Sequence, residues 1–115
     1  MQKTIKYMIL TGKCKEDFYK WYVRTGNVHY SAPNLFLRLP KSMQYGVYVD
    51  FFDSVEIRIS MNQFKNTYWY DIEKTGDESD ELKTRQEARE QAILKANEIF
   101  NKNIATLLRY ISDYG

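Results

Sequence analysis

The chain has 115 residues and a formal net charge of +2; 43% of its residues are hydrophobic, 28% are charged and 16% are aromatic. A chain of this length can bury one modest core without disulfides or metals, so we expect a single domain over residues 1–115. The only cysteine, Cys14, excludes an intramolecular disulfide and a cysteine-based structural zinc site, and it favours a reducing, cytoplasmic setting. Neither a secretory signal nor a membrane span is expected, because no apolar run is long enough.

The first predicted helix covers residues 14–25, with the sequence CKEDFYKWYVRT. Its buried side is expected to consist of residues at the spacing of one helical face: Cys14, Phe18, Trp21 and Tyr22. Gly26 ends the helix, because glycine tolerates the left-handed conformation that closes one. Residues 26–41 then form a predicted connection that contains two prolines. Its apolar anchors are expected to be Phe36, Leu37 and Leu39.

The second predicted helix covers residues 43–54, within the aromatic stretch KSMQYGVYVDFFDSVEIRI. As a strand this stretch would have one mixed face, whereas helical spacing collects most apolar side chains into two adjacent rows. The rows are Met43, Val47, Phe51 and Val55, and Tyr48 with Phe52; Gln44, Asp50 and Asp53 lie outside them. We expect Ser42 to cap this helix through its hydroxyl, and Pro40 to disfavour an earlier start. Gly46 in the helix interior indicates a close approach by another element.

Two strands are predicted next, over residues 55–61 and 66–73, because the hydrophobic period changes to two. The alternating apolar residues are Val55, Ile57, Ile59 and Met61 in the first strand, and Tyr68, Tyr70 and Ile72 in the second. The NQFKN segment between them fits a hairpin loop. Two strands alone are marginally stable in water, so we expect helices to cover one face of the hairpin.

A long C-terminal helix is predicted over residues 84–112, after an acidic, exposed loop at residues 75–82. Thr84 and Glu87 have the spacing of a capping box. The inward face is expected to contain Ala88, Ala92, Ile93, Ala96, Ile99 and Phe100. The NKN sequence at residues 101–103 leaves two alternatives open, a continuous helix or a break. The fold class is therefore α+β, one small domain in the order α-α-β-β-α, with a two-stranded antiparallel hairpin packed against helices.

This sequence contains few of the residues and motifs that form catalytic sites. There is one histidine, His29, and no glycine-rich phosphate loop or cysteine–histidine motif, so we predict no catalytic site, no cofactor and no metal site. His29 fits a surface or capping role, and Cys14 fits a core position. Asp50 and Asp53, with Glu56 nearby, are the only carboxylates spaced to share a cation, and a solvated helix face explains them better. An enzyme that uses Asp50 and Asp53 is the third hypothesis.

Nucleic-acid binding is the second hypothesis. Residues 1–41 hold eight Lys or Arg against two Asp or Glu. The candidate residues are Lys13, Lys15, Lys20, Arg24, Lys83, Arg85 and Arg89. The segment TRQEAREQAILKANEIF resembles the last helix of double-stranded-RNA-binding domains, which implies that Lys83, Arg85 and Arg89 touch phosphates across the RNA groove. The acids of GDESDE depart from that family's basic approach to the helix, and they would repel a polyanion.

Three segments resemble the recurrent blocks of a family of small proteins from Bacteroides-type gut bacteria and their phages or mobile elements. These segments are LTGKCKEDFYKW, LPKSMQYGVYVDFFDSVEI and KTRQEAREQAILKANEIFN, and the resemblance covers about residues 9–102. The resemblance to this family implies no particular activity. The family usually has glycine after the Asp-Ser-Val segment, where this chain has Glu56.

The leading hypothesis is a small, non-enzymatic accessory or interaction protein of a phage or mobile element. A helix of about 30 residues would be about 45 Å long, which is longer than a domain of this size can cover. Its apolar residues beyond the core would need a partner, most simply a second copy of the chain. The predicted interface residues are Ile104, Leu107, Leu108 and Ile111. The order of hypotheses is therefore self-association, then nucleic-acid binding, then catalysis.

Overall fold

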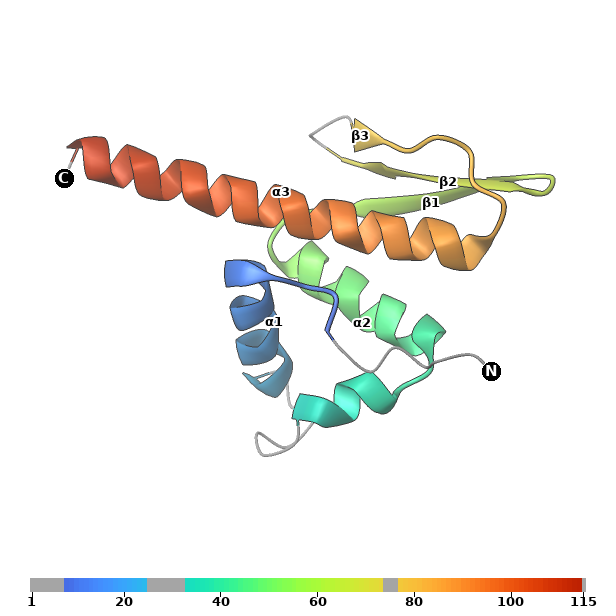
Figure 1. Cartoon of the computed structure of the whole chain (residues 1–115), viewed down its shortest axis with the longest axis horizontal. Coiled ribbons are helices and arrows are strands. Elements are labelled where there is room, and N and C mark those ends of the chain that lie inside the picture. Colours follow the sequence, from blue (N-terminus) through green and yellow to red (C-terminus); the bar gives the residue numbers. More distant parts are fainter. Residues whose placement is uncertain (1–7, 25–32, 74–76, 115) are drawn as a thin grey trace.

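The structure, a computed structural model, describes residues 8–24, 33–73 and 77–114, without the side chains of residues 33–35 and 108–114. Its elements are α1 (Gly12–Arg24), the 3-10 helix η1 (Pro33–Arg38), α2 (Lys41–Ser54), β1 (Ile59–Phe64), β2 (Thr67–Ile72), β3 (Asp77–Glu78) and α3 (Arg85–Tyr114). Figure 1 shows α3 between the sheet on one side and α1 and α2 on the other. The α+β class and the α-α-β-β-α order are thus confirmed, and the short β3 extends the predicted hairpin.

α1 begins two residues before its predicted start and buries Cys14, Phe18 and Tyr22. Phe18 lies at the centre of an aromatic cluster, where the ring centroids of Tyr22, Phe36 and Tyr48 are 5.7, 5.1 and 5.3 Å from its own. The described part of the predicted connection forms η1, which buries Phe36 completely, while Leu37 and Leu39 are partly buried. Gly26 and His29 lie outside the described residues.

α2 differs from its prediction in how it begins and in which face it buries. The helix starts at Lys41 after Pro40, so Ser42 lies inside the first turn and does not cap it. The buried residues are Gln44, Tyr48, Phe51 and Phe52, whereas Met43 and Val55 are 55% and 37% exposed. Gln44 is buried because its Nε2 donates hydrogen bonds to the carbonyl oxygens of Leu39 (2.8 Å) and Leu37 (3.3 Å), which end η1.

A side-chain amide with good partners can thus displace a methionine from the core. The expectation for Gly46 is also wrong, because a Cβ at this position would meet nothing within 4 Å.

The turn after α2 delays the first strand, which begins at Ile59 and not at Val55. The Ile57 N–H donates to the carbonyl of Phe52 (2.8 Å) and the Glu56 N–H donates to that of Asp53 (3.1 Å). These two bonds form the Schellman motif, which closes a helix with a left-handed residue, here Glu56 with φ of 65°. β1 in turn extends to Phe64, so part of the expected loop is strand and only Lys65 and Asn66 connect β1 to β2.

The expected acidic loop at residues 75–82 is partly paired with the sheet. β3 pairs antiparallel with β2 through Asp71 with Glu78 and Ile72 with Asp77. The pairing continues beyond β3, since the Leu82 N–H donates to the Tyr68 carbonyl (2.7 Å) and the Tyr68 N–H donates to the Leu82 carbonyl (2.9 Å). Regular backbone hydrogen bonds along β2 therefore order a segment whose composition suggested an exposed loop.

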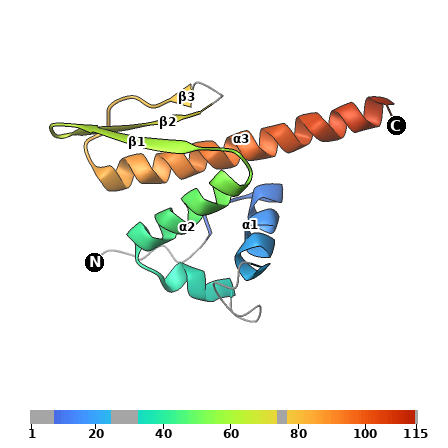
Figure 2. The same ribbon diagram turned by 180° about the vertical axis from the view of Figure 1, so that it is seen from behind.

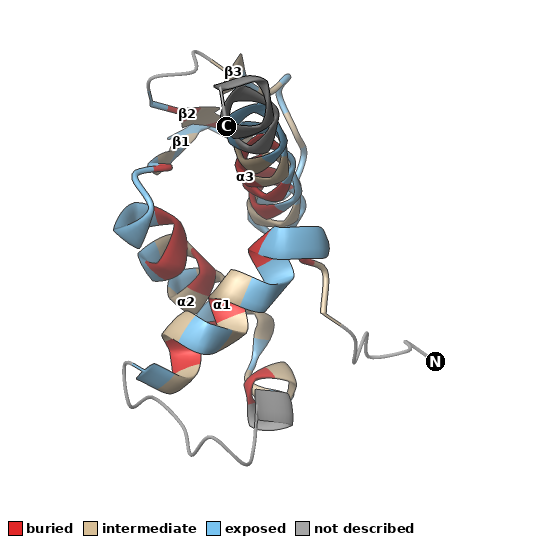
Figure 3. Cartoon of the chain, turned by 90° about the vertical axis from the view of Figure 1, so that its left-hand side faces the viewer, coloured by how far each residue is buried: buried red, intermediate tan, exposed pale blue. Residues whose placement is uncertain are grey.

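α3 is continuous from Arg85 to Tyr114, which decides between the two alternatives left open at residues 101–103. Thr84 caps its N-terminus, accepting the Glu87 N–H at its Oγ1 (3.1 Å). The buried residues of α3 include all those of the expected inward face: Ala88, Ala92, Ile93, Ala96, Ile99 and Phe100. From behind, β1 and β2 lie across this helix (Figure 2). The end-on view in Figure 3 shows the buried residues of the three α-helices around a common interior.

Candidate interaction surface

The predicted nucleic-acid residues are divided between two parts of the molecule. Four are on α1 and three are near the start of α3; in Figure 1, α1 lies below the middle of α3, away from the right-hand end where α3 starts. Lys13 forms an ion pair with Asp17 (3.2 Å). Lys15, Lys20, Arg24 and Lys83 are exposed. The structure therefore does not gather the seven residues into one patch.

Two of the candidate arginines contact aromatic rings of the protein itself. The Arg85 guanidinium lies 5.6 Å from the centre of the Tyr68 ring and donates a hydrogen bond to Gln63 Oε1 (3.1 Å). The Arg89 guanidinium lies 5.2 Å from the centre of the Tyr45 ring. Such cation–aromatic contacts attach the start of α3 to β2 and α2.

The carboxylates Asp50 and Asp53 are both exposed on α2. Among the described residues, no cluster of three or more His, Cys, Asp or Glu side chains is arranged to hold a metal ion. Cys14 is fully buried, and burial followed by the nearby Asp17 charge raises the pKa of its thiol to about 12. A thiol with this pKa carries almost no thiolate near neutral pH, so Cys14 has the properties of a core residue and not of a nucleophile.

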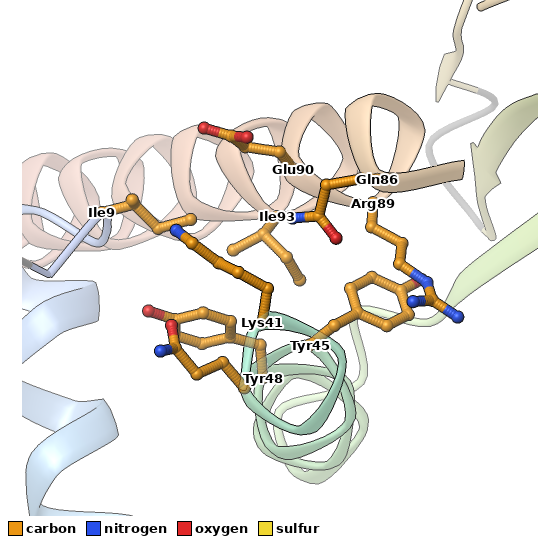
Figure 4. A pocket seen from close by; sticks show the side chains of 9 residues that line it. Ile9, Lys41, Tyr45, Tyr48, Gln86, Arg89, Glu90 and Ile93 are labelled. Carbon is orange, nitrogen blue, oxygen red and sulfur yellow. The ribbon is translucent and has the colours of Figure 1, made fainter. Parts of the chain in front are cut away.

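A small cleft lies between α2 and α3, next to the Arg89–Tyr45 contact (Figure 4). Its free volume is about 30 Å³, which suits a single water molecule and not a metabolite. Burial raises the pKa of Tyr45, and the Arg89 charge opposes this increase. Burial also raises the pKa of Tyr48, whose hydroxyl contacts Met8 Sδ at 3.3 Å. Both phenols are therefore neutral groups of the core near neutral pH.

A larger, mostly apolar groove of about 330 Å³ lies beside the middle of α3. We call it the α3 groove. Its walls come from α1, from the turn between α2 and β1, and from α3: Asp17, Val55, Ile57, Phe100, Asn103 and Ile104. Val55 and Ile57 belong to the turn and not to the sheet, because β1 begins only at Ile59. No hydrophobic period could have indicated this groove, since it depends on how the turn lies against a distant helix.

The α3 end, defined as residues 105–114, continues past the groove and away from the other elements (Figure 1). Of the predicted interface residues, Ile104 packs partly against the core and Leu107 is 52% exposed. The side chains of Leu108 and Ile111 lie outside the described residues. Among the side chains of α3 that the structure describes, Phe100 is the last buried one, and residues 105–107 are exposed.

Comparisons with family models, curated proteins and solved structures find no match for this chain. Within the described residues, no helix combines the length and the apolar character that a membrane span requires.

The candidate surface that the geometry defines is the α3 groove together with the α3 end.

Proposed function

We propose that this protein is a small, non-enzymatic interaction protein that self-associates through the α3 end. The observation that carries the proposal is the uninterrupted 30-residue α3, on which Phe100 is the last buried residue among the described side chains. Thirty residues of α-helix extend about 45 Å, close to the 51 Å length of the whole molecule. Packing supplies most helical stability in proteins, so a partner that covers the α3 end would stabilise the part of the helix beyond Phe100.

The sequence of the α3 end provides the contacts for such a partner. Leu107, Leu108 and Ile111 continue the spacing of one helical face that starts at Ile104. Leu107 is 52% exposed. Exposed apolar side chains are a feature of protein–protein interfaces, and a second copy supplies an identical surface that pairs by two-fold symmetry. An accessory role in a phage or mobile element is part of the proposal, supported by the resemblance of the three sequence blocks.

Leu107→Glu tests the proposal by placing a charge within the predicted interface. Burying a leucine stabilises by about 1.5–3 kcal/mol, and a symmetric dimer contains the contact twice. We therefore expect the substitution to weaken the dimer at least about 100-fold, because each 1.4 kcal/mol is a factor of ten. Light scattering or analytical ultracentrifugation over a concentration series measures the change.

Leu94→Glu is the matched control, since Leu94 is also on α3 and is 44% exposed, but lies outside the α3 end. Both substitutions introduce the same good helix former, so a difference in association between the two variants does not come from intrinsic helix propensity. The proposal fails if the unmodified protein is monomeric at high concentration, or if Leu107→Glu and Leu94→Glu associate equally well.

A further inference from the structure

The two edges of the sheet differ in length and in charge. β3 forms one edge, and its two residues, Asp77 and Glu78, are acidic. β1 forms the other edge with six residues, and its sequence ISMNQF contains neither a charged residue nor a proline. Its register with β2 runs without interruption from Ile59 to Phe64, so no bulge disturbs it. Short strands, charges, prolines and bulges protect sheet edges from other strands, and β1 has none of these four features.

The pairing of β1 with β2 determines which backbone groups point to the free edge. The Glu73 N–H donates to the Arg58 carbonyl (3.0 Å), so these two residues are a hydrogen-bonded pair of the antiparallel ladder. Hydrogen-bonded and non-hydrogen-bonded pairs alternate along such a ladder. Every second residue of β1 therefore directs its N–H and C=O away from β2: Ile59, Met61 and Gln63. Within the part of the chain that the structure describes, no hydrogen bond reaches these backbone groups.

These backbone groups specify what kind of molecule fits the edge. Alternating N–H and C=O groups are complementary to the backbone of another extended strand, which binds by adding to the sheet. β1 also carries Phe64, whose exposure of 64% is the highest among the large hydrophobic side chains of the described residues. An added strand would thus cover apolar surface as well as satisfy backbone groups.

Basic residues flank the uncharged strand at both ends. Arg58 precedes β1 and Lys65 follows it. The Arg58 side chain is 60% exposed, and its ion pair with Glu73 is long, at 4.0 Å. An exposed pair of this kind contributes little, so Arg58 remains available to another carboxylate.

The same charges argue against a second copy of β1 as the added strand. If two copies of β1 pair antiparallel about Met61, Arg58 of one copy lies opposite Phe64 of the other, next to Lys65. Like charges would then meet at both ends of the interface, which is unfavourable, whereas opposite charges favour the correct partner and orientation. The edge therefore fits a different chain, whose extended segment carries acidic residues at its ends.

We propose that the free edge of β1 is a strand-addition site for an extended segment of another protein, about six uncharged residues long and flanked by Asp or Glu. The backbone of the segment pairs with Ile59, Met61 and Gln63, and its flanking carboxylates lie near Arg58 and Lys65. β1 lies beside the first half of α3, far from the α3 end (Figure 1). The inference is therefore independent of the proposed self-association.

Amide hydrogen exchange followed by NMR tests the site residue by residue, with a designed peptide as the probe. The probe is Glu-Thr-Val-Thr-Val-Thr-Val-Glu with blocked termini. At about 90% occupancy it should slow exchange of the Ile59, Met61 and Gln63 amides about tenfold, because only the unoccupied protein exchanges. The amides of Ser60 and Asn62 should not change, since they already face β2.

Control peptides separate the contribution of the backbone from that of the charges. Two versions of the probe carry N-methyl groups on alternating residues, one in each of the two possible frames. Only the frame that methylates the donors facing β1 should lose binding, because the side chains of the two versions are identical. A third peptide with Lys in place of both Glu residues should bind at least about tenfold more weakly.

Gln63→Pro locates the site on the protein. Proline removes the N–H that Gln63 directs to the free edge and is tolerated in edge strands, whereas Gln63→Ala removes the same side chain but keeps the N–H. We expect Gln63→Pro to raise the dissociation constant of the probe at least about tenfold relative to Gln63→Ala. If Gln63→Pro does not fold, the exchange pattern and the methylated peptides decide.

Three results would overturn the proposal. The first is no binding of the probe at about 1 mM, the weak limit of specific affinities. The second is equal binding of the two methylated peptides, or protection of amides outside β1. The third is protection of the β1 amides that rises with protein concentration in the absence of peptide, which would assign the edge to a second copy of the chain.

Discussion

Glu56 adopts a left-handed backbone conformation, with φ of 65°, in the turn that closes α2. A residue with a Cβ is strained in this region, and glycine is not. The conformation persists with glutamate because the buried Phe52 and Ile57 and the two backbone hydrogen bonds of the Schellman motif hold the turn in place.

Glu56→Gly should therefore stabilise the protein by about 1 kcal/mol, because it relieves the strain at this position. The measurement is the free energy of unfolding from urea titration, with Glu56→Ala as the control. Alanine also removes the glutamate side chain and its interactions but keeps the Cβ, so we expect no comparable gain. Equal effects of the two substitutions would show that the side chain and not the backbone conformation matters.

At the scale of elements, side chains from α3 hold the N-terminus of α1. The Cys14 N–H donates to Asn101 Oδ1 (3.0 Å), and Asn101 Nδ2 donates to the Thr11 carbonyl (2.9 Å). One turn earlier on α3, the buried Asn97 accepts the Thr11 N–H (3.0 Å) and donates to the Thr11 Oγ1 (3.0 Å). Asn101 thus satisfies an N–H of the first turn of α1, which normally requires a capping residue on the same helix.

This contact explains why the NKN sequence at residues 101–103 does not break the helix, which was one of the two alternatives left open. Asparagine is disfavoured in a helix interior because its side chain competes for backbone groups. Here the side chain of Asn101 bonds the backbone of another helix, so α3 continues undisturbed. The close approach also explains glycine at position 12, where φ is +61° and a Cβ would come within 3.2 Å of Asn101 Oδ1.

Asn101→Ala should destabilise the protein by about 1–2 kcal/mol, the usual cost of losing a helix cap. Asn103→Ala is the matched control, because Asn103 is exposed on the same helix and the gain in helix propensity is identical. Urea unfolding of the two variants measures the difference. If Asn101→Ala is as stable as Asn103→Ala, the hydrogen bonds to α1 contribute nothing to stability.

At the scale of the whole molecule, one core contains a thiol and several phenols that must stay protonated. Burial raises the pKa values of Cys14, Tyr22, Tyr48 and Tyr70. The folded protein therefore binds these protons more tightly than the unfolded chain does. For Cys14 the contribution to stability is complete below its ordinary pKa of 9.0 and is lost as the pH rises toward about 12.

We accordingly expect the free energy of unfolding to decrease above about pH 9, at first by up to about 1.4 kcal/mol per pH unit as one proton is released. Urea titrations at pH 8, 9, 10 and 11 measure the slope. Cys14→Ala should reduce the slope between pH 9 and 10, before the tyrosines contribute. A stability that is constant from pH 8 to pH 11 would contradict the burial of these groups.

Local patterns predicted the elements more reliably than their faces and ends. The apolar repeat of α3 indicated its buried residues correctly, because an alanine-rich stripe on a long helix leaves no competing face. In α2 the apolar and aromatic residues are spread over most of the helix circumference, so periodicity could not separate the buried Gln44 from the exposed Met43. The partner of Gln44 is the end of η1, a contact that no pattern within α2 contains.

Hydrophobic period and helix capping are local properties, and they were sufficient to predict the α+β class, the order of the elements and the buried stripe of α3. The three-dimensional structure was needed to find that Glu56 turns the chain, that Asn101 caps a distant helix, and that Val55 and Ile57 join α3 around a groove. These features depend on contacts between segments far apart in the chain. Their stability comes from packing and hydrogen bonds between those segments, and the spacing of residues along one segment carries no information about such contacts.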